Sequence, residues 1–75
     1  MYSVDSVVKA FSNKVINHEV KDEQCKRKVH IETINPRNSH MLTFYENGGD
    51  FFVEEKDSQL QYLIKKKVIN RELLK

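Results

Sequence analysis

Asp50, Glu54 and Lys56 are the residues of this chain whose types come nearest to a catalytic set. Paired carboxylates hold a divalent ion, and a lysine beside them stabilises the charge that develops when a phosphodiester is cleaved. Their spacing is too short for such a site, and Asp50 belongs to a predicted turn. We therefore interpret them as a solvated strand end followed by a helix cap. A metal-dependent nuclease would instead show activity that a chelator abolishes.

Histidine and cysteine offer the other ligand and nucleophile chemistry in the sequence. His30-Ile31-Glu32 matches the first half of a zinc-deaminase signature, but the Cys-x-x-Cys half is absent. No recognised zinc-ligand spacing occurs among the candidates, which are His18, His30, His40 and Cys25. Cys25 is the single cysteine and lies in a charged stretch, so we expect an exposed thiol in a reducing compartment. The sequence predicts no enzyme, no catalytic, cofactor-binding or metal residues, and no cofactor.

Length, charge and hydropathy limit the fold and the compartment. Seventy-five residues make one small α+β domain, spanning 1-75, and 32% charged residues suit a folded soluble chain. No stretch approaches the roughly 20 apolar residues that cross a bilayer, and the first residues lack the basic-then-apolar order of a signal peptide. We expect a cytoplasmic protein without a membrane partner. The net charge of +2 is too small to indicate nucleic-acid binding by itself.

Periodicity predicts a helix near the start of the chain and a strand after a charged connection. Ser3 is a suitable N-cap, and apolar residues follow at the spacing of one helical face: Val4, Val7, Val8, Phe11 and Val15. From Lys28 to Asn35 the apolar residues instead alternate with a period of two, which indicates a half-buried strand. Asn35-Pro36 then supplies a turn, because proline has no amide proton and disfavours helix at the residue before it.

Asn47-Gly48, between two apolar and aromatic runs, predicts a β-hairpin. If these two residues form the loop, Phe44 lies opposite Phe51. Leu42 then lies opposite Val53, and these four residues form the core face. The other face is more apolar than a purely solvated face should be, since it carries Met41, Thr43, Tyr45, Phe52 and Glu54. A slip of one residue would exchange the two faces.

The last predicted element is a helix from about Ser58 to the C-terminus, with Ser58 and Gln61 in capping-box spacing. Its apolar residues form two stripes at helical spacing. The stripes are Leu60, Leu63, Ile64 and Val68 on one side, and Tyr62, Ile69 and Leu73 on the other. One sheet cannot cover both. Either the helix kinks or restarts near Asn70, or the second stripe meets another chain.

The predicted order is helix, strand, strand, strand, helix. The simplest packing is an α+β, two-layer domain in which a three-stranded antiparallel sheet carries both helices on one face. This order, with Pro36 and His40 in the loop between the first two strands, resembles the double-stranded-RNA-binding domain in topology. The resemblance implies a lysine-rich cluster that opens the second helix and meets phosphates. This chain has Glu54-Glu55-Lys56-Asp57 there, so no residue of that family is carried over.

We expect a non-enzymatic binding or regulatory protein that acts by contact with a larger protein target. Its size and composition are typical of accessory or inhibitor proteins, including those of phages and mobile elements. Aromatic and methionine side chains on uncovered faces are enriched at interface centres. The predicted partner surface is Met41, Tyr45, Phe52, Tyr62, Ile69 and Leu73. The same stripes fit a homodimer, and the competing interpretation is that one of these faces closes the core.

The alternative function is nucleic-acid binding through a basic patch. It requires the first predicted strand and the second helix to end on the same side of the molecule. The residues of this patch are Lys26, Arg27, Lys28, Lys65, Lys66 and Arg71. Lysine-rich faces also serve solubility and protect sheet edges, which is the competing interpretation of the same residues.

Overall fold

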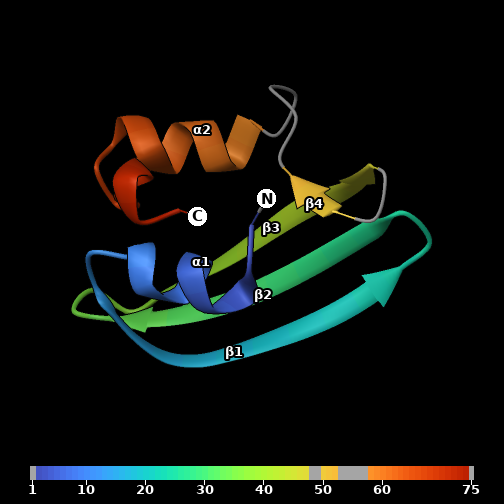
Figure 1. Ribbon diagram of the computed structural model, residues 1–75. Helices are drawn as coiled ribbons and strands as arrows, with labels where there is room; N and C mark the ends of the chain where they lie inside the picture. Colours follow the sequence, from blue (N-terminus) through green and yellow to red (C-terminus); the bar gives the residue numbers. More distant parts are fainter. Residues whose placement is uncertain (1, 48–49, 53–57, 75) are drawn as a thin grey trace.

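The computed structural model describes residues 2–47, 50–52 and 58–74, and at 47 and 50–52 it describes the backbone alone. The elements are α1 (Val4–Ala10), β1 (Lys14–Glu23), β2 (Lys26–Ile34), β3 (Asn38–Asn47), β4 (Asp50–Phe52), α2 (Ser58–Lys65) and the 3-10 helix η1 (Arg71–Leu73) (Figure 1). Several predictions fall outside the described residues: those for Gly48, Val53 and Glu54 to Asp57, and those for the side chains of Asp50, Phe51 and Phe52. The set Asp50, Glu54 and Lys56 is among them.

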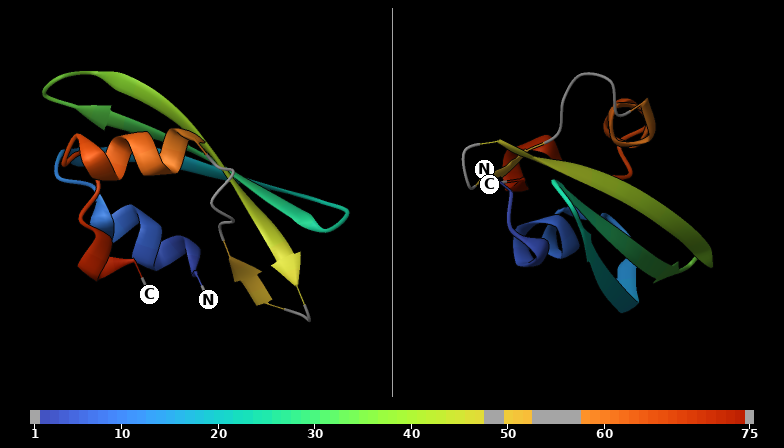
Figure 2. Two further views of the ribbon diagram at one scale, coloured as in Figure 1. Left: turned by 90° about the horizontal axis from the view of Figure 1, so that it is seen from above. Right: turned by 90° about the vertical axis from the view of Figure 1, so that its right-hand side faces the viewer.

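The described strands form one antiparallel sheet in the order β1-β2-β3-β4. Most of it consists of the three long strands β1, β2 and β3, and the three-residue β4 pairs with the end of β3. Residues of α1 and α2 join one cluster with a single face of β2 and β3, so the helices form the second layer (Figure 2). The predicted α+β class, an antiparallel sheet with two helices, is confirmed.

Alternation along β2 and β3 decides which face of the sheet is buried. Val29 lies opposite Leu42, and both side chains are fully buried. Leu42 and Phe44 were predicted on the core face, and this is confirmed. The core cluster is Val7, Ala10, Phe11, Val29, Ile31, Leu42, Phe44, Leu60, Leu63, Ile69 and Leu74. Its apolar area supplies the main driving force for folding.

The structure differs from the prediction between residues 11 and 23. Ser3 and Ser6 form a capping box at the start of α1, but the helix ends at Ala10, because Phe11 is extended (φ −70°, ψ 134°). Val15 therefore belongs to β1 and not to the helical stripe, although its spacing from Phe11 fits a helix. The charged run that follows is the rest of this strand, which pairs along its length with β2. Pairing with a partner strand outweighed the local pattern.

The register of the β3–β4 hairpin also differs from the prediction. Asn47 pairs with Asp50 and Glu46 with Phe51, so the predicted pairing of Phe44 with Phe51 is wrong. The observed register is displaced by two residues from the predicted one. Because side chains alternate with a period of two, this displacement leaves each residue of β3 on its predicted face.

The C-terminal segment follows the alternative in which the last helix stops and restarts. α2 ends at Lys65, and Lys67 adopts the left-handed conformation (φ 61°). The Lys67 amide donates to the Ile64 carbonyl (3.0 Å) and the Val68 amide to the Leu63 carbonyl (2.9 Å), which is the Schellman pattern of helix ends. Asn70 then caps η1 through its side chain, which accepts from the Glu72 amide.

Candidate functional site

An open cleft of about 560 Å³ lies between α2 and the loop that joins β2 to β3. Its volume falls within the usual range of ligand sites. The cleft is lined by Asn13, Pro36, Asn38, Ser39, His40, Gln59, Tyr62, Leu63, Lys66 and Val68. None of these described lining residues is acidic, and one is a lysine. The lining is therefore a mixture of polar and apolar side chains, with one tyrosine and one positive side chain among them.

The helical wall of the cleft is one face of α2 and its last turn. Gln59, Tyr62, Leu63 and Lys66 follow one another at the spacing i, i+3, i+4 and i+7. Leu63 is buried and attaches this face to the core, whereas Tyr62 is 57% exposed. The helix thus holds an aromatic side chain at the solvent boundary on a rigid support.

Lys66 fixes the surroundings of the Tyr62 ring. Its amide donates to the Tyr62 carbonyl at 2.9 Å, which extends the helical hydrogen bonding past Lys65. Its Nζ atom lies 5.8 Å from the centroid of the Tyr62 ring, within the range of a cation–π contact. The pair presents a flat aromatic surface next to a positive charge, which suits an apolar or acidic group of a partner.

His40 lines the cleft from the β3 side and is nearly buried. Its ring packs against Phe11 with the ring centroids 5.2 Å apart. Burial, and secondarily the electrostatic interaction with His30, lower the pKa of His40 from its ordinary value of 6.5. Its Nε2 atom is buried and has no hydrogen-bond partner among the described residues. Burial thus favours the neutral form of the His40 ring.

The outer face of the sheet carries a separate polar pair. His30 Nε2 and Ser39 Oγ form a hydrogen bond, and Glu19 lies opposite His30 in the register of β1 and β2. A serine beside a histidine is the first requirement for an activated nucleophile, and a group that orients the histidine is the second. Among the described residues, His30 donates no hydrogen bond to the Glu19 carboxylate.

The structure distributes the predicted partner residues over two layers. Met41 (47% exposed) and Tyr45 (half-buried) lie on the outer face of β3, away from the helices. Tyr62 and Leu73 (52% exposed) belong to the helical layer instead. The prediction for Ile69 is wrong: it is 1% exposed, because the chain leaves the helix at Lys67 and the phase of the stripe is lost. The side chain of Phe52 lies outside the described residues.

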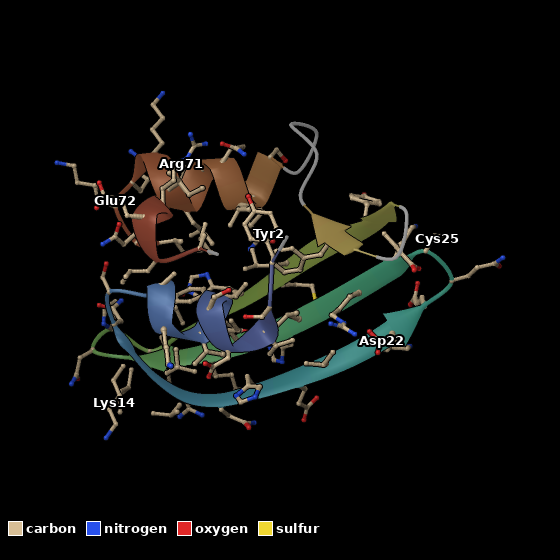
Figure 3. All side chains as sticks on the ribbon, in the orientation of Figure 1. Tyr2, Lys14, Asp22, Cys25, Arg71 and Glu72 are labelled. Atoms are coloured by element: carbon tan, nitrogen blue, oxygen red, sulfur yellow. The ribbon has the colours of Figure 1, made fainter. Side chains whose placement is uncertain are left out.

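The predicted basic patch is divided between opposite ends of the molecule. Lys26, Arg27 and Lys28 begin β2, beside the hairpin tip at Cys25. Lys65, Lys66 and Arg71 lie at the far end, where α2 stops and η1 begins (Figures 1 and 3). Arg27 pairs with Asp22 (2.7 Å) and Lys28 with Glu23 (3.4 Å). Lys26, Arg27 and Lys28 stand at the start of β2 and the other three basic residues at the end of α2 and in η1, so the six do not form one patch.

The remaining candidates for chemistry have simple environments. Cys25 is a free, exposed thiol, as predicted. No group of three or more His, Cys, Asp or Glu side chains that could hold a metal ion occurs within the described ranges. The helices described here are too short or too polar to cross a membrane.

Searches among known protein families, curated proteins and solved structures find no match to this chain.

The sequence indicated Tyr62 and Lys66 as candidate contact residues, but not the cleft that they border. Pro36 was noted only as a loop residue, and His40 as a loop residue and as a histidine without zinc-ligand spacing. Asn13, Asn38 and Gln59 were not singled out. One signal was available, because Gln59, Tyr62 and Lys66 lie along one side of the buried stripe of α2. That the β2–β3 loop packs near this side is a tertiary fact with no local signal.

Proposed function

We propose that this domain works by binding another protein and not by catalysis, and that the cleft beside Tyr62 is its contact surface. The observation that carries the proposal is a largely exposed tyrosine at the edge of a concave surface, with the Lys66 Nζ atom 5.8 Å from its ring centroid. Tyrosine at the margin of a cleft supplies a large contact area at low entropic cost. In this role the domain regulates or inhibits a larger target protein by binding one of its segments in the cleft.

The lining of the cleft indicates the chemistry of that segment. Lys66 is positive, no acidic side chain is among the described lining residues, and Asn38 and Gln59 offer amide donors and acceptors. Val68 and Leu63 provide the apolar part. We therefore expect an extended segment that combines an acidic residue with an apolar side chain, since this matches both the charge and the hydrogen-bonding capacity.

A Tyr62→Ala variant tests this proposal. Peptides selected from a random displayed library on the wild-type protein should be enriched in Asp or Glu next to an apolar residue. Removing the Tyr62 ring should weaken their binding about 10- to 100-fold, as for other interface anchors. Lys66→Glu should also weaken the binding of the acidic peptides, because it replaces the positive charge by a negative one. Calorimetric titration measures the affinity for both variants.

Tyr45→Ala is the matched control, because it removes the same side chain from the outer face of the sheet. It should leave the affinity for the selected peptides unchanged. Loss of binding in Tyr45→Ala with none in Tyr62→Ala would move the contact surface to the outer face. In a pull-down from cell lysate with the wild-type protein, recovery of only nuclease-sensitive, salt-labile material would replace the proposal by nucleic-acid binding.

A further inference from the structure

β1 is an edge strand of ten residues whose outer side is unpaired within the described structure. β2 occupies one side of it, and in Figure 1 no other element lies beyond the opposite side. Val20 and Ile16 are 43% and 45% exposed along this strand. The free N–H and C=O groups of an edge are able to accept another strand.

The regular part of β1 limits how a second copy of the same strand could pair with it. A bulge lies between Val15 and Asn17, so the regular segment is 17–23, which is centred on Val20. In an antiparallel pair of strands, two directly opposed residues form either a hydrogen-bonded pair or a non-hydrogen-bonded pair, and the two kinds of pair alternate along the strands. A residue can therefore lie opposite itself or opposite a residue an even number of positions away, but not opposite its neighbour in the sequence. Two identical strands can therefore pair only about a two-fold axis that passes through a residue.

An axis at Val20 brings opposite charges together. Glu19 then faces Lys21 of the second copy, and symmetry repeats this pair on the other side. His18 faces Asp22 of the second copy, which places a ring N–H donor opposite a carboxylate. Val20 faces Val20 of the second copy, so the two exposed valines cover each other. Such opposed pairs are the side-chain interactions that stabilise a sheet.

Neighbouring axes bring like charges together. An axis at Glu19 opposes two glutamates, and an axis at Lys21 opposes two lysines. An axis at His18 extends the pairing across the bulge next to Val15, where the regular alternation is broken. The charges of the segment therefore select the register centred on Val20, because like charges directly opposite destabilise a sheet.

The contacts within one copy leave these charges available. Lys28 on β2 lies opposite Lys21, but it pairs with Glu23 (3.4 Å). Among the described residues, neither Glu19 nor Lys21 has an ion-pair partner. Charged side chains normally protect an edge from association, since they repel or mismatch an arbitrary strand. Here the arrangement is complementary to itself.

We propose that two copies of this chain associate through β1, antiparallel and about a two-fold axis at Val20, so that the two sheets become continuous. The interface is isologous, which is the common form of a dimer. Residues of β1 do not line the Tyr62 cleft, so each copy keeps its cleft open.

Charge exchange across the axis tests the proposal. Sedimentation velocity over a concentration series should show the wild-type protein as a dimer. Glu19→Lys opposes lysines and Lys21→Glu opposes glutamates, so each variant alone should be a monomer. The double variant restores opposite charges and should be a dimer. A mixture of the two single variants should form a heterodimer, because both lysines of the first variant then meet glutamates of the second.

Lys14→Glu is the matched control, because it reverses a charge on β1 outside the segment 17–23 and should leave the dimer intact. A wild-type protein that stays monomeric throughout the series would overturn the proposal. So would a dimer that persists in both single variants, or one that neither the double variant nor the mixture restores. Amide spectra of each variant confirm that the fold is retained, and the mixture tests association even where one variant is less stable.

Discussion

His40 shows at the scale of one residue how the folded structure changes ionisation, with burial as the larger cause. Its ring is packed against Phe11 in the core-facing row of β3, and burial with the nearby His30 lowers its pKa. In the unfolded chain the ring has its ordinary pKa of about 6.5. Just below that pH the unfolded state therefore binds more protons than the folded state, so the free energy of unfolding rises with pH.

The contribution of His40 to the free energy of unfolding should not change with pH above about 6.5. Below that pH the free energy of unfolding should fall, until the pH reaches the lowered pKa of His40 in the folded state. Urea unfolding between about pH 8 and pH 5 measures it. The slope should disappear in His40→Leu and persist in His18→Gln, since His18 is exposed. A slope that survives in His40→Leu would assign it to another group.

At the scale of elements, the end of α2 is the feature that sets the C-terminal structure. Lys67 occupies the position of the Schellman motif at which glycine is usual. Glycine is favoured at this position because any side chain crowds the backbone at positive φ. The segment after it returns to α1: the Ser12 amide donates to the Val68 carbonyl and the Asn70 amide to the Ala10 carbonyl, both at 2.8 Å. This turn is what brings Ile69 into the core.

Lys67→Gly should raise the free energy of unfolding by about 0.5 to 1 kcal/mol, because glycine adopts the left-handed conformation without steric cost. Lys65→Gly, two residues earlier in α2, should lower it by a similar amount, because glycine is unfavourable in a helix. Denaturant unfolding of both variants gives the comparison. Changes of the same sign in the two variants would show that Lys67 is not strained.

At the scale of the whole molecule, one core joins the sheet, both helices and the C-terminal segment. Phe11 and Ile69 form an isolated β-bridge, so the end of α1 and the segment after α2 are held together over a long sequence separation. The molecule is elongated, with extents of 37 × 22 × 18 Å. Its helices contact only part of the sheet, which leaves Val20 on β1 exposed.

Ile69→Ala should lower the free energy of unfolding by about 2 to 5 kcal/mol, because it leaves a cavity where α1 meets the C-terminal segment. Leu73→Ala, at a residue 52% exposed on η1, should change it by less than about 0.5 kcal/mol. Thermal and urea unfolding distinguish the two. Comparable losses would mean that Leu73 is buried in solution, which a partner or a second copy would explain.

The sequence by itself determined the elements whose patterns are local. Alternation from Lys28 to Asn35 and along β3 identified the central strands and the buried face of Leu42 and Phe44, since a half-buried strand must alternate. Ser58 and the stripe that contains Leu60 and Leu63 identified α2 in the same way. The α+β class follows from these elements.

Only the tertiary structure decided the features that depend on distant partners. β1 is a strand because β2 lies beside it, although Val15 continues the helical spacing of α1. Ile69 is buried because Lys67 turns the chain back to Phe11. The cleft beside Tyr62 and the open edge at Val20 arise from packing between segments far apart in the sequence. Local patterns record which faces are apolar, but the free energy of burial depends on what covers them.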